Sequence, residues 1–262
     1  MAVAKYVFFQ AHPDDLEINC PYLLHHLARR GHEIRIASVT KGEFGLPGPQ
    51  YDHLKGDFLV KIRENELANA CAIHGIPRES IDYLGYIDGF VTLTKSFTTH
   101  IAQYLNEQKP DVIIAPEGLY AWYYHMDHLN TGRAVFYVIN KGLIDYIPSL
   151  YFYDSLSPNT FFPVQSEDLD VADQVIDCHK TQWWIMSWMR HLVRPVRLLG
   201  GFRVRGWKYA EPYRHIFFDE ELDRAHRPGP IVQGFTHFMS GIPFFQAKYT
   251  QDILEERRRK AR

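Results

Sequence analysis

Residues 6–17, Tyr-Val-Phe-Phe-Gln-Ala-His-Pro-Asp-Asp-Leu-Glu, decide the fold, because an apolar run leads directly into a charged turn. Residues 7–10 are typical of a short buried strand. Apolar residues then recur with helical spacing over 18–27 and stop at Gly31, a residue type that commonly ends helices. Residues 34–40 alternate and are β-branched, which predicts a second strand. A strand, a helix and a strand within about 35 residues predict a βαβ unit with parallel strands.

The same alternation continues to about residue 155. The expected elements are a loop at 41–56, a helix at 58–74, a strand at 81–84, a helix at 96–108, a strand at 111–115, a helix at 129–141 and a strand at 149–153. The pattern then weakens, and we expect a helix over 170–192, strands or loops over 204–218 and a frayed helix end at 255–262. This order predicts an α/β fold: a Rossmann-like, doubly wound, mostly parallel sheet with helices on both faces and a C-terminal extension.

The composition fits one domain and argues against several classes of protein. The 262 residues are 46% hydrophobic, enough for one large core, so we treat 1–262 as a single domain with its core at about 5–155. A net charge of -2 argues against a nucleic-acid partner. The three cysteines are scattered, which indicates a reducing cytoplasm. We recognise no signal peptide, and no apolar run approaches the roughly 20 residues of a transmembrane segment.

The aromatic segment at 183–188, Trp-Trp-Ile-Met-Ser-Trp, has several interpretations. Aromatic residues form 15% of the chain, and most of them are expected to fill the core. We predict that this segment belongs to the core or to a contact in a homo-oligomer. An interfacial membrane patch is the alternative.

Two polar motifs follow two of the predicted strands and carry candidate chemistry. His12 and Asp15 lie three residues apart in a tight turn, so both can converge on zinc or another divalent transition ion. His125 and His128 are also three apart, at the entry to a helix, and share a face. A catalytic zinc keeps a position for water, whose pKa falls to roughly 7. Asp14 is then spare as a general base, and a spare histidine can protonate an amine or stabilise an oxyanion.

Each motif also has an ordinary structural explanation. The chain contains 14 histidines, so one pair spaced by three is weak evidence. The turn at 12–15 could be a proline-containing loop whose aspartate caps a helix. Both motifs, however, come at the carboxyl ends of strands in one predicted sheet, where ligands bind in such folds. We therefore favour a hydrolytic site.

These residues resemble the motifs of the PIG-L/LmbE-like zinc-dependent N-acetylglucosaminyl deacetylases. Residues 11–17 match the first motif of that family, and residues 125–128 match the second with Met126 in place of proline. Weaker family features follow in order at 40–43, 63–66, 88–89, 179–182 and 210–213, so the resemblance extends from about residue 5 to 218. Many relatives carry a Gly-Gly pair where this chain has Asn-Cys-Pro-Tyr at 19–22, and we expect the helix start to pack differently.

The resemblance implies a role for five polar residues of the two motifs. It implies that His12, Asp15 and His128 bind one zinc ion per chain, with Fe²⁺ or Mn²⁺ as alternatives. It implies Asp14 as the general base. It also implies His125 as the electrostatic or acid partner of the reaction.

Further residues resemble the substrate contacts of the family. Tyr123 resembles a mobile tyrosine that polarises the amide carbonyl, and Tyr124 competes for that role. Arg63 and Asp88 resemble residues that hold sugar hydroxyls. Two more residues are expected to orient a ligand, cap a helix or support the structure: Glu17 and His179.

The implied function is removal of the acetyl group from an N-acetylated amino sugar of the N-acetylglucosamine type, or from its glycoside or conjugate. One alternative is an amidase or esterase of the same mechanism acting on a non-sugar substrate. A second is a metal-retaining sugar-binding protein without turnover, against which the intact Asp14 argues. A nucleotide-binding protein is disfavoured, because the first strand leads into His-Pro-Asp-Asp and not into a GxGxxG turn.

Overall fold

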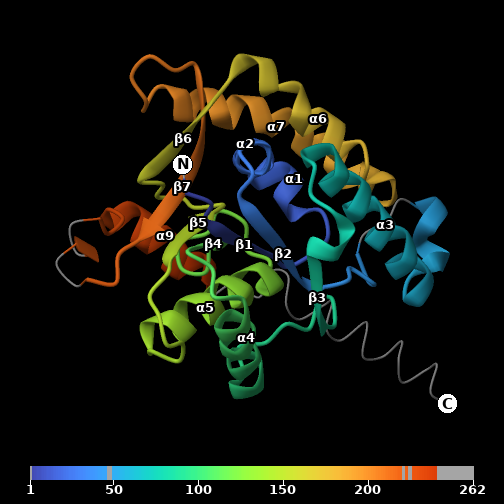
Figure 1. The fold of residues 1–262 in the computed structure, drawn as a ribbon, viewed down its shortest axis with the longest axis horizontal. Helices are drawn as coiled ribbons and strands as arrows, with labels where there is room; N and C mark the ends of the chain where they lie inside the picture. Colours follow the sequence, from blue (N-terminus) through green and yellow to red (C-terminus); the bar gives the residue numbers. More distant parts are fainter. Residues whose placement is uncertain (1, 46–48, 220–221, 224–225, 241–262) are drawn as a thin grey trace.

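A seven-stranded sheet organises the molecule (Figure 1). The computed structural model describes residues 2–45, 49–219, 222–223 and 226–240. Its strands are β1 (Lys5–Gln10), β2 (Glu33–Thr40), β3 (Ile81–Tyr86), β4 (Val112–Pro116), β5 (Ser149–Tyr153), β6 (Thr160–Val164) and β7 (Tyr209–Ile216). They lie in the order β3-β2-β1-β4-β5-β7-β6; β1 to β5 run parallel, and β7 pairs antiparallel with both β5 and β6. The predicted α/β class with a mostly parallel sheet is confirmed.

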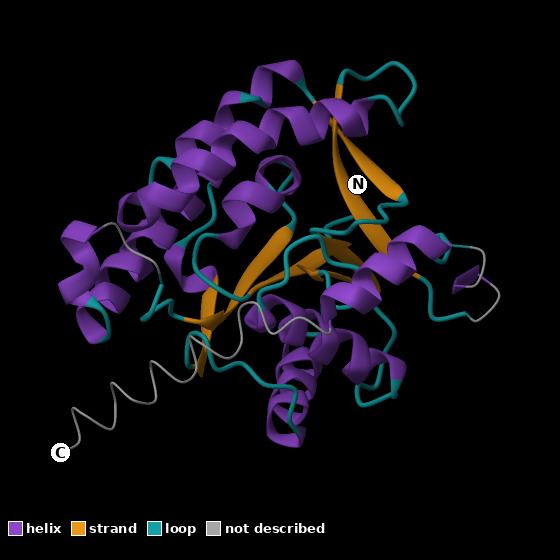
Figure 2. Cartoon of the chain, turned by 180° about the vertical axis from the view of Figure 1, so that it is seen from behind, coloured by secondary structure: helices purple, strands orange, loops and turns teal. Residues whose placement is uncertain are grey.

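Helices cover both faces of this sheet (Figures 1 and 2). The α-helices are α1 (Asp15–Asn19), α2 (Pro21–Arg29), α3 (Asp57–His74), α4 (Lys95–Gln108), α5 (Met126–Asn140), α6 (Asp170–Ile176), α7 (Trp183–Gly201) and α9 (Pro230–Ser240). Short 3-10 helices are η1 (Pro49–Leu54), η2 (Arg78–Ser80), η3 (Ser166–Asp168) and η4 (Lys180–Gln182). Helices α4 and α5 lie on one face, whereas α1, α2 and α3 lie on the other, with α6 and α7 packed outside them (Figure 1).

The central strand β1 shows why its sequence is a continuous apolar run. Val7 and Phe9 pack in the core cluster that includes Phe97 of α4. Phe8, between them, packs on the opposite face in the cluster that includes Leu67 of α3. Both faces of a doubly covered parallel sheet are buried, so the strand does not alternate between apolar and polar residues.

The helix predicted over 18–27 is broken into α1 and α2 at Cys20-Pro21. Arg197 donates through Nη2 to the last two carbonyls of α1, both at 2.8 Å. Glu211 accepts from the backbone N–H groups of Tyr22 and Leu23, the first two N–H groups of α2 after Pro21, at 3.2 and 2.7 Å. Arg197 and Glu211 also pair with each other at 3.1 Å and are 4% and 0% exposed. A buried ion pair from a distant part of the chain therefore satisfies both helix ends, and the expectation that this helix start packs differently from that of relatives stays a prediction.

The helix predicted over 170–192 is wrong in its middle, where a turn separates α6 from α7. Glu66 of α3 accepts from the Thr181 backbone N–H at 2.8 Å and from its hydroxyl at 2.6 Å. His179 lies 3.3 Å from Glu17, and both side chains are buried. These contacts hold residues 179–182 in a turn, because buried polar groups must find partners.

The C-terminal third completes the sheet and lines one wall of the molecule. β7 pairs with both β5 and β6. α7 packs closely on it, since a Cβ at Gly200 or Gly201 would overlap backbone carbonyls near the start of β7. Three tryptophans of the aromatic segment in α7 are exposed, Trp183 to 43%, Trp184 to 70% and Trp188 to 63%. The core alternative is therefore wrong for them, and the contact in a homo-oligomer stays a prediction.

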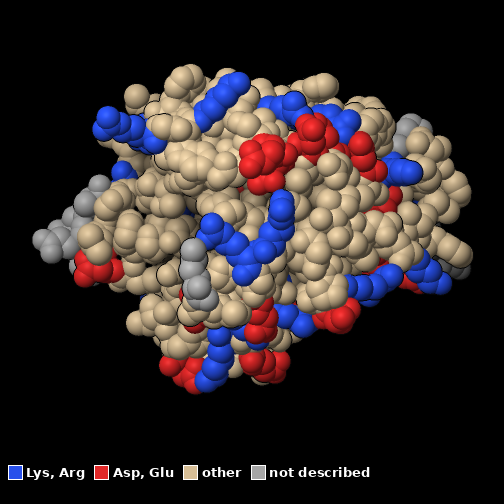
Figure 3. Space-filling model, turned by 45° about the horizontal axis from the view of Figure 1, so that its top comes forward, with Lys and Arg blue, Asp and Glu red and all other residues tan. Residues whose placement is uncertain are grey.

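The surface carries charges of both signs. On the face shown in Figure 3, basic and acidic side chains are interspersed. Among the described helices, none combines the length and apolar character needed to cross a bilayer. The predicted helix end at 255–262 lies outside the described residues.

Candidate metal and catalytic site

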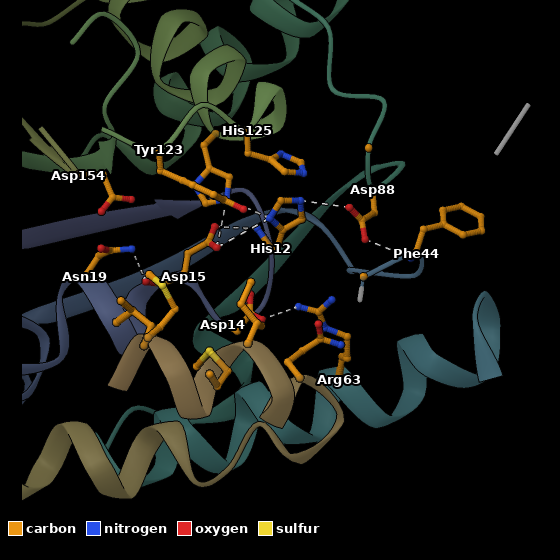
Figure 4. Close-up of a pocket in the computed structure, with 18 of the residues that line it drawn as sticks. His12, Asp14, Asp15, Asn19, Phe44, Arg63, Asp88, Tyr123, His125 and Asp154 are labelled. Carbon is orange, nitrogen blue, oxygen red and sulfur yellow. Dashed lines mark hydrogen bonds and ion pairs between the residues drawn. The ribbon is translucent and has the colours of Figure 1, made fainter. Parts of the chain in front are cut away.

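The two motifs meet where the strand order reverses. β1 pairs with β2 on one side and with β4 on the other, so the chain leaves these two neighbouring strands in opposite directions. The turn after β1 holds residues 11–17, and the segment after β4 leads to residues 125–128. Ligands in doubly wound folds bind at this point, outside the carboxyl ends of the strands. Figure 4 shows the pocket that lies there.

Three side-chain atoms converge in this pocket. His12 Nδ1 lies 3.1 Å from His128 Nε2, and Asp15 Oδ1 lies 3.3 Å from His128 Nε2 and 3.8 Å from His12 Nδ1. Ligands at about 2.0–2.1 Å around a tetrahedral zinc are about 3.3 Å apart. The second oxygen of Asp15 accepts from the backbone N–H groups of Ala11 and His12 at 2.8 and 2.9 Å, which orients the first. The donor set and its spacing fit a divalent transition ion.

His125 borders the same centre. One ring nitrogen each from His12, His125 and His128 lies within 4.8 Å of the others, so these imidazoles form a second candidate set. The His125 ring stands edge-on to His12 with centroids 4.8 Å apart. The structure thus brings four of the predicted site residues to one point, with Asp14 beside them: His12, Asp15, His125 and His128.

The far side of the His12 ring faces two carboxylates. His12 Nε2 lies 3.1 Å from Asp88 Oδ1 and 3.2 Å from Asp127 Oδ2. Asp127 also accepts from the backbone N–H groups of Gly89 and Val91 at 2.6 and 3.1 Å. Carboxylates on the second nitrogen of a histidine orient it for metal binding. Burial alone lowers the pKa of His12, but Asp88, Asp127 and Asp15 outweigh it and raise the pKa well above its usual range.

Asp127 is a functional candidate that sequence reasoning missed, although it lies inside the second motif. Asp88, predicted to hold a sugar hydroxyl, lies at the pocket edge and is only 5% exposed. Its second oxygen accepts from the Phe44 backbone N–H at 3.1 Å. Burial raises the pKa of Asp88, but His12 and Arg63 outweigh this and bring it to about 2. It is therefore a carboxylate at neutral pH.

Arg63 lies against the predicted general base. Its Nη2 is 3.1 Å from Asp14 Oδ2, and its Nη1 donates to the Gly42 carbonyl at 3.0 Å. A Cβ at Gly42 or Gly45 would overlap the guanidinium, so these glycines leave room for it. The glycine in the Thr-Lys-Gly-Glu feature at 40–43 is thus explained by the space that the Arg63 guanidinium needs. Arg63 is 1% exposed and orients Asp14 as well as lining the pocket.

His125 and Tyr123 line the same pocket as the candidate metal-binding atoms. His125 Nδ1 accepts from the Asp127 backbone N–H at 3.2 Å, so the neutral ring carries its proton on Nε2. Burial, with the nearby His12 and His128, lowers the pKa of His125 to about 4. Burial raises the pKa of Tyr123 to about 12, which keeps the phenol protonated. Both groups are proton donors at neutral pH.

Tyr123 lines the pocket and Tyr124 points elsewhere. The Tyr124 hydroxyl donates to the Thr236 carbonyl of α9 at 3.4 Å. Glu17 and His179 pair with each other and are not pocket-lining residues. The structure therefore brings Tyr123 to the site and keeps Glu17 and His179 beneath it.

Sequence reasoning also missed several pocket residues. The amide of Gln182 lines the pocket and is 3% exposed, and its Nε2 has no hydrogen-bond partner within the described part of the chain. Asn19 and Asp154 line it as well. The outer wall is apolar and consists of Ile18, Phe44, Trp122, Ile185, Met186 and Met189. The family-like feature at 179–182 marked the turn that carries Gln182, but it did not predict that the Gln182 side chain lines the pocket.

Comparison with known sequences identifies the family. The family described as "PIG-L: GlcNAc-PI de-N-acetylase" matches residues 7–139. The chain belongs to this family. The resemblance noted in the motifs is thereby confirmed.

Individual relatives cover part of the chain. A 1D-myo-inositol 2-acetamido-2-deoxy-alpha-D-glucopyranoside deacetylase of Mycolicibacterium gilvum (strain PYR-GCK) is 28% identical over 159 residues, 51% of this chain and 53% of that protein. A protein of the same name from Kineococcus radiotolerans is 28% identical over 159 residues, 50% of this chain and 43% of that protein. The chain spans about half the length of the curated relatives it matches.

Solved structures share the fold. The N,N'-diacetylchitobiose deacetylase from Pyrococcus horikoshii superposes with a TM-score of 0.72 at 21% identity, over 81% of this chain and 84% of that one. A 4-carboxy-2-hydroxymuconate hydratase from Pseudomonas putida KT2440 superposes with a TM-score of 0.64 at 16% identity, over 82% and 97%. The second protein has a different reaction in its name, so the fold alone does not decide the activity.

Proposed function

We propose that this protein is a metal-dependent hydrolase that removes acetate from an N-acetylated amino sugar of the N-acetylglucosamine type or from its glycoside or conjugate. The observation that carries the proposal is the convergence of His12 Nδ1, Asp15 Oδ1 and His128 Nε2 with Asp14 beside them. The names of the PIG-L family and of its curated relatives support the substrate class. Zinc is the proposed metal, with Fe²⁺ or Mn²⁺ as alternatives.

The proposed roles follow from the chemistry of each group. When bound, a divalent ion supplies a Lewis acid that lowers the pKa of water to roughly 7. Asp14, oriented by Arg63, takes a proton from the attacking water while the water oxygen forms a bond to the carbonyl carbon of the acetyl group. The Nε2–H of His125 and the hydroxyl of Tyr123 donate to the oxyanion. The proton on Asp14 then passes to the amine nitrogen as the C–N bond breaks.

Arg63 and Asp88 are proposed to border the ring of the N-acetylated sugar. Both line the pocket on the side of α3 and β3 (Figure 4). Each already has a protein partner, so a sugar hydroxyl would share these groups with Asp14 and His12. We propose further that residues 1–262 form a single domain and that this domain acts in the cytoplasm on a small-molecule substrate. The formation of a homo-oligomer stays a prediction.

Acetate release tests the reaction. Zinc-loaded protein, chelator-treated protein and the Asp14→Asn variant would be assayed on N-acetylglucosamine, diacetylchitobiose, an N-acetylglucosaminyl conjugate and a simple acetamide. The exposed Asp145, which pairs with Lys109 on the surface at 3.1 Å, provides a matched Asp145→Asn control. We expect release from a sugar that chelation and Asp14→Asn abolish and Asp145→Asn leaves intact.

Other outcomes identify the alternatives. Release from the acetamide or an ester but from no sugar would indicate an amidase or esterase with the same site. Sugar binding at one metal per chain without any release would indicate a binding protein. Full activity of Asp14→Asn would refute the assigned base.

A further inference from the structure

Helix α7 carries an exposed apolar stripe along its outer side. The members of this α7 stripe are spaced so that they share one face of the helix: Trp184, Trp188, Pro195, Leu198, Leu199 and Phe202. Leu199 is 66% exposed, and Phe202, which follows the helix directly, is 80% exposed. The opposite face of α7 packs in a core cluster through Met186 and Val193. The core therefore accounts for only one of the two apolar faces of this helix.

The same segment carries charge of one sign. Residues 183–208 contain no acidic residue, although the chain as a whole has a net charge of -2. The segment contains these basic residues: Arg190, Arg194, Arg197, Arg203, Arg205 and Lys208. The first three pair with carboxylates in or next to α6 and in β7. The last three follow the end of α7, are exposed and form no ion pair within the described part of the chain. Their charge is therefore available to an anionic partner.

An anionic lipid surface matches both features. A contiguous exposed apolar patch marks a contact with another molecule or a membrane. Helices that lie in a membrane interface bury Trp, Phe and Leu at the boundary between headgroups and acyl chains. Basic side chains next to such a helix are attracted to anionic headgroups. The α7 stripe supplies the first set of groups, and the basic residues after it supply the second.

A second copy of the chain matches them less well. In a symmetric dimer the same surface of each subunit meets the other. Two copies of residues 183–208 would then face each other, and neither contains an acidic residue to pair with the exposed arginines of its mate. Like charges in contact oppose association. The charge of the segment therefore favours a lipid surface.

The position of α7 relates this surface to the pocket. Ile185, Met186 and Met189 line the pocket from the inner side of the helix, whereas Trp184 and Trp188 are exposed on its outer side. α7 lies on the outside of the molecule in Figure 1. A surface in contact with the α7 stripe would therefore be separated from the pocket by the width of one helix, about 10 Å.

We propose that the α7 stripe, with Arg203, Arg205 and Lys208 beside it, is a docking surface for an anionic lipid bilayer. The protein binds the bilayer from one side, by inserting the stripe at the level of the headgroups. The proposal adopts the interfacial alternative for the aromatic segment in place of the contact between copies. It goes beyond the proposed deacetylation and does not depend on it.

Co-sedimentation of the full chain with vesicles tests the apolar part of the surface. The vesicles consist of phosphatidylcholine alone or of phosphatidylcholine mixed with phosphatidylserine. Trp184→Gln combined with Trp188→Gln should reduce the partition coefficient on both kinds of vesicle about tenfold or more, because two rings no longer leave water. The matched control is Tyr137→Gln with Leu143→Gln, which changes two exposed apolar residues at and after α5, on the opposite side of the sheet. This control should bind like the wild type.

A second pair of variants tests the charge. Arg203→Gln with Arg205→Gln should reduce binding to the vesicles that contain phosphatidylserine about tenfold or more and leave binding to phosphatidylcholine unchanged. Lys95→Gln with Lys141→Gln removes the same charge from the exposed surface near α4 and α5 and should have less effect. The difference between the two kinds of vesicle should shrink when the salt concentration rises from about 0.1 M to about 1 M. All these side chains are exposed, so the melting temperature should stay within about 2 °C of the wild type.

The outcomes decide between a lipid surface and a second copy. A wild-type protein that stays in the supernatant with phosphatidylserine vesicles at about 0.1 M salt overturns the proposal. Equal binding by the tryptophan variant and its control overturns it as well. A dimer in sedimentation velocity that the tryptophan variant dissociates, without vesicle binding, shows instead that the stripe joins two copies. None of these measurements uses acetate release, so failure of the docking surface leaves the deacetylase assignment standing, and the reverse.

Discussion

The buried pair of Arg197 and Glu211 gives a sharp test of the fold. Glu211 is 0% exposed and accepts four hydrogen bonds, from two backbone N–H groups of α2, from the Tyr213 hydroxyl at 2.9 Å and from Arg197 at 3.1 Å. Glu211→Gln keeps the volume but places an amide N–H₂ group where a carboxylate oxygen accepted. It also leaves Arg197 as a buried cation without a counter-charge.

These contacts set the expected loss of unfolding free energy in Glu211→Gln. Removing one partner of a buried pair destabilises a protein by about 3–5 kcal/mol. Arg197 keeps its two bonds to the end of α1, so we expect the lower value, about 3 kcal/mol. With an m-value of about 3 kcal/mol/M in urea, the unfolding midpoint should fall by about 1 M.

Urea unfolding followed by circular dichroism measures this shift. Asp173→Asn is the matched control, because Asp173 is 40% exposed and bonds only surface arginines, and we expect it to cost less than about 1 kcal/mol. Arg197→Met combined with Glu211→Gln should cost less than the sum of the two single changes. A Glu211→Gln midpoint equal to that of Asp173→Asn would refute the assigned role of the pair.

Three further changes test the site and its support. Asp127→Asn should weaken metal binding about 10- to 100-fold, because it weakens the acceptor on Nε2 of the proposed metal ligand His12. Competition with a chelator measures the affinity for the metal, and an unchanged affinity contradicts the prediction. Gly42→Ala should reduce the rate of acetate release on the order of 10²-fold, because the new Cβ would displace Arg63. The control Gly31→Ala is also at a positive φ but has no atom within 4 Å of its new Cβ, and it should cost only about 1 kcal/mol of stability. Equal rates in both variants would argue against a role for the close approach of Gly42 to Arg63. Burial lowers the pKa of His74 from 6.5 to about 3, so the unfolded chain takes up a proton below pH 6.5 that the folded chain excludes, and stability falls as the pH drops from 6.5 toward 3. His74→Leu should flatten this fall by up to about 1.4 kcal/mol per pH unit in urea titrations at pH 7 and pH 5, and parallel slopes for the two proteins would exclude it.

The sequence predicted the elements whose causes are local. The strand at 34–40 was predictable from its alternating β-branched residues, and the helix at 58–74 from the Gly75 that follows it; they match β2 and α3. The breaks at Cys20 and at residues 177–182 were not readable. Their polar partners lie more than 100 residues away along the chain, in Glu211 and Glu66. No local pattern records such a contact.

The same distinction applies to the candidate site. His12, Asp15, His125 and His128 could be expected to converge, because each follows a strand of one parallel sheet. Asp154 could not, since nothing near it in the sequence marks a ligand and its direction depends on a positive φ. Arg63 was expected at the substrate but lies 3.1 Å from Asp14, a distance set by how α3 packs against the turn after β1.

The two faces of His12 explain why two separate motifs are needed. Its Nδ1 faces Asp15 and His128, while its Nε2 faces Asp88 and Asp127. The second motif therefore supplies both a neighbour for the metal side and an acceptor for the opposite side of the same ring. A turn after β1 could carry the histidine and one carboxylate, but it could not fix the orientation of the imidazole. The pairing of β1 with β4 brings Asp127 within reach of this ring, and β3, through β2, brings Asp88, so the candidate metal-binding geometry depends on the sheet as a whole.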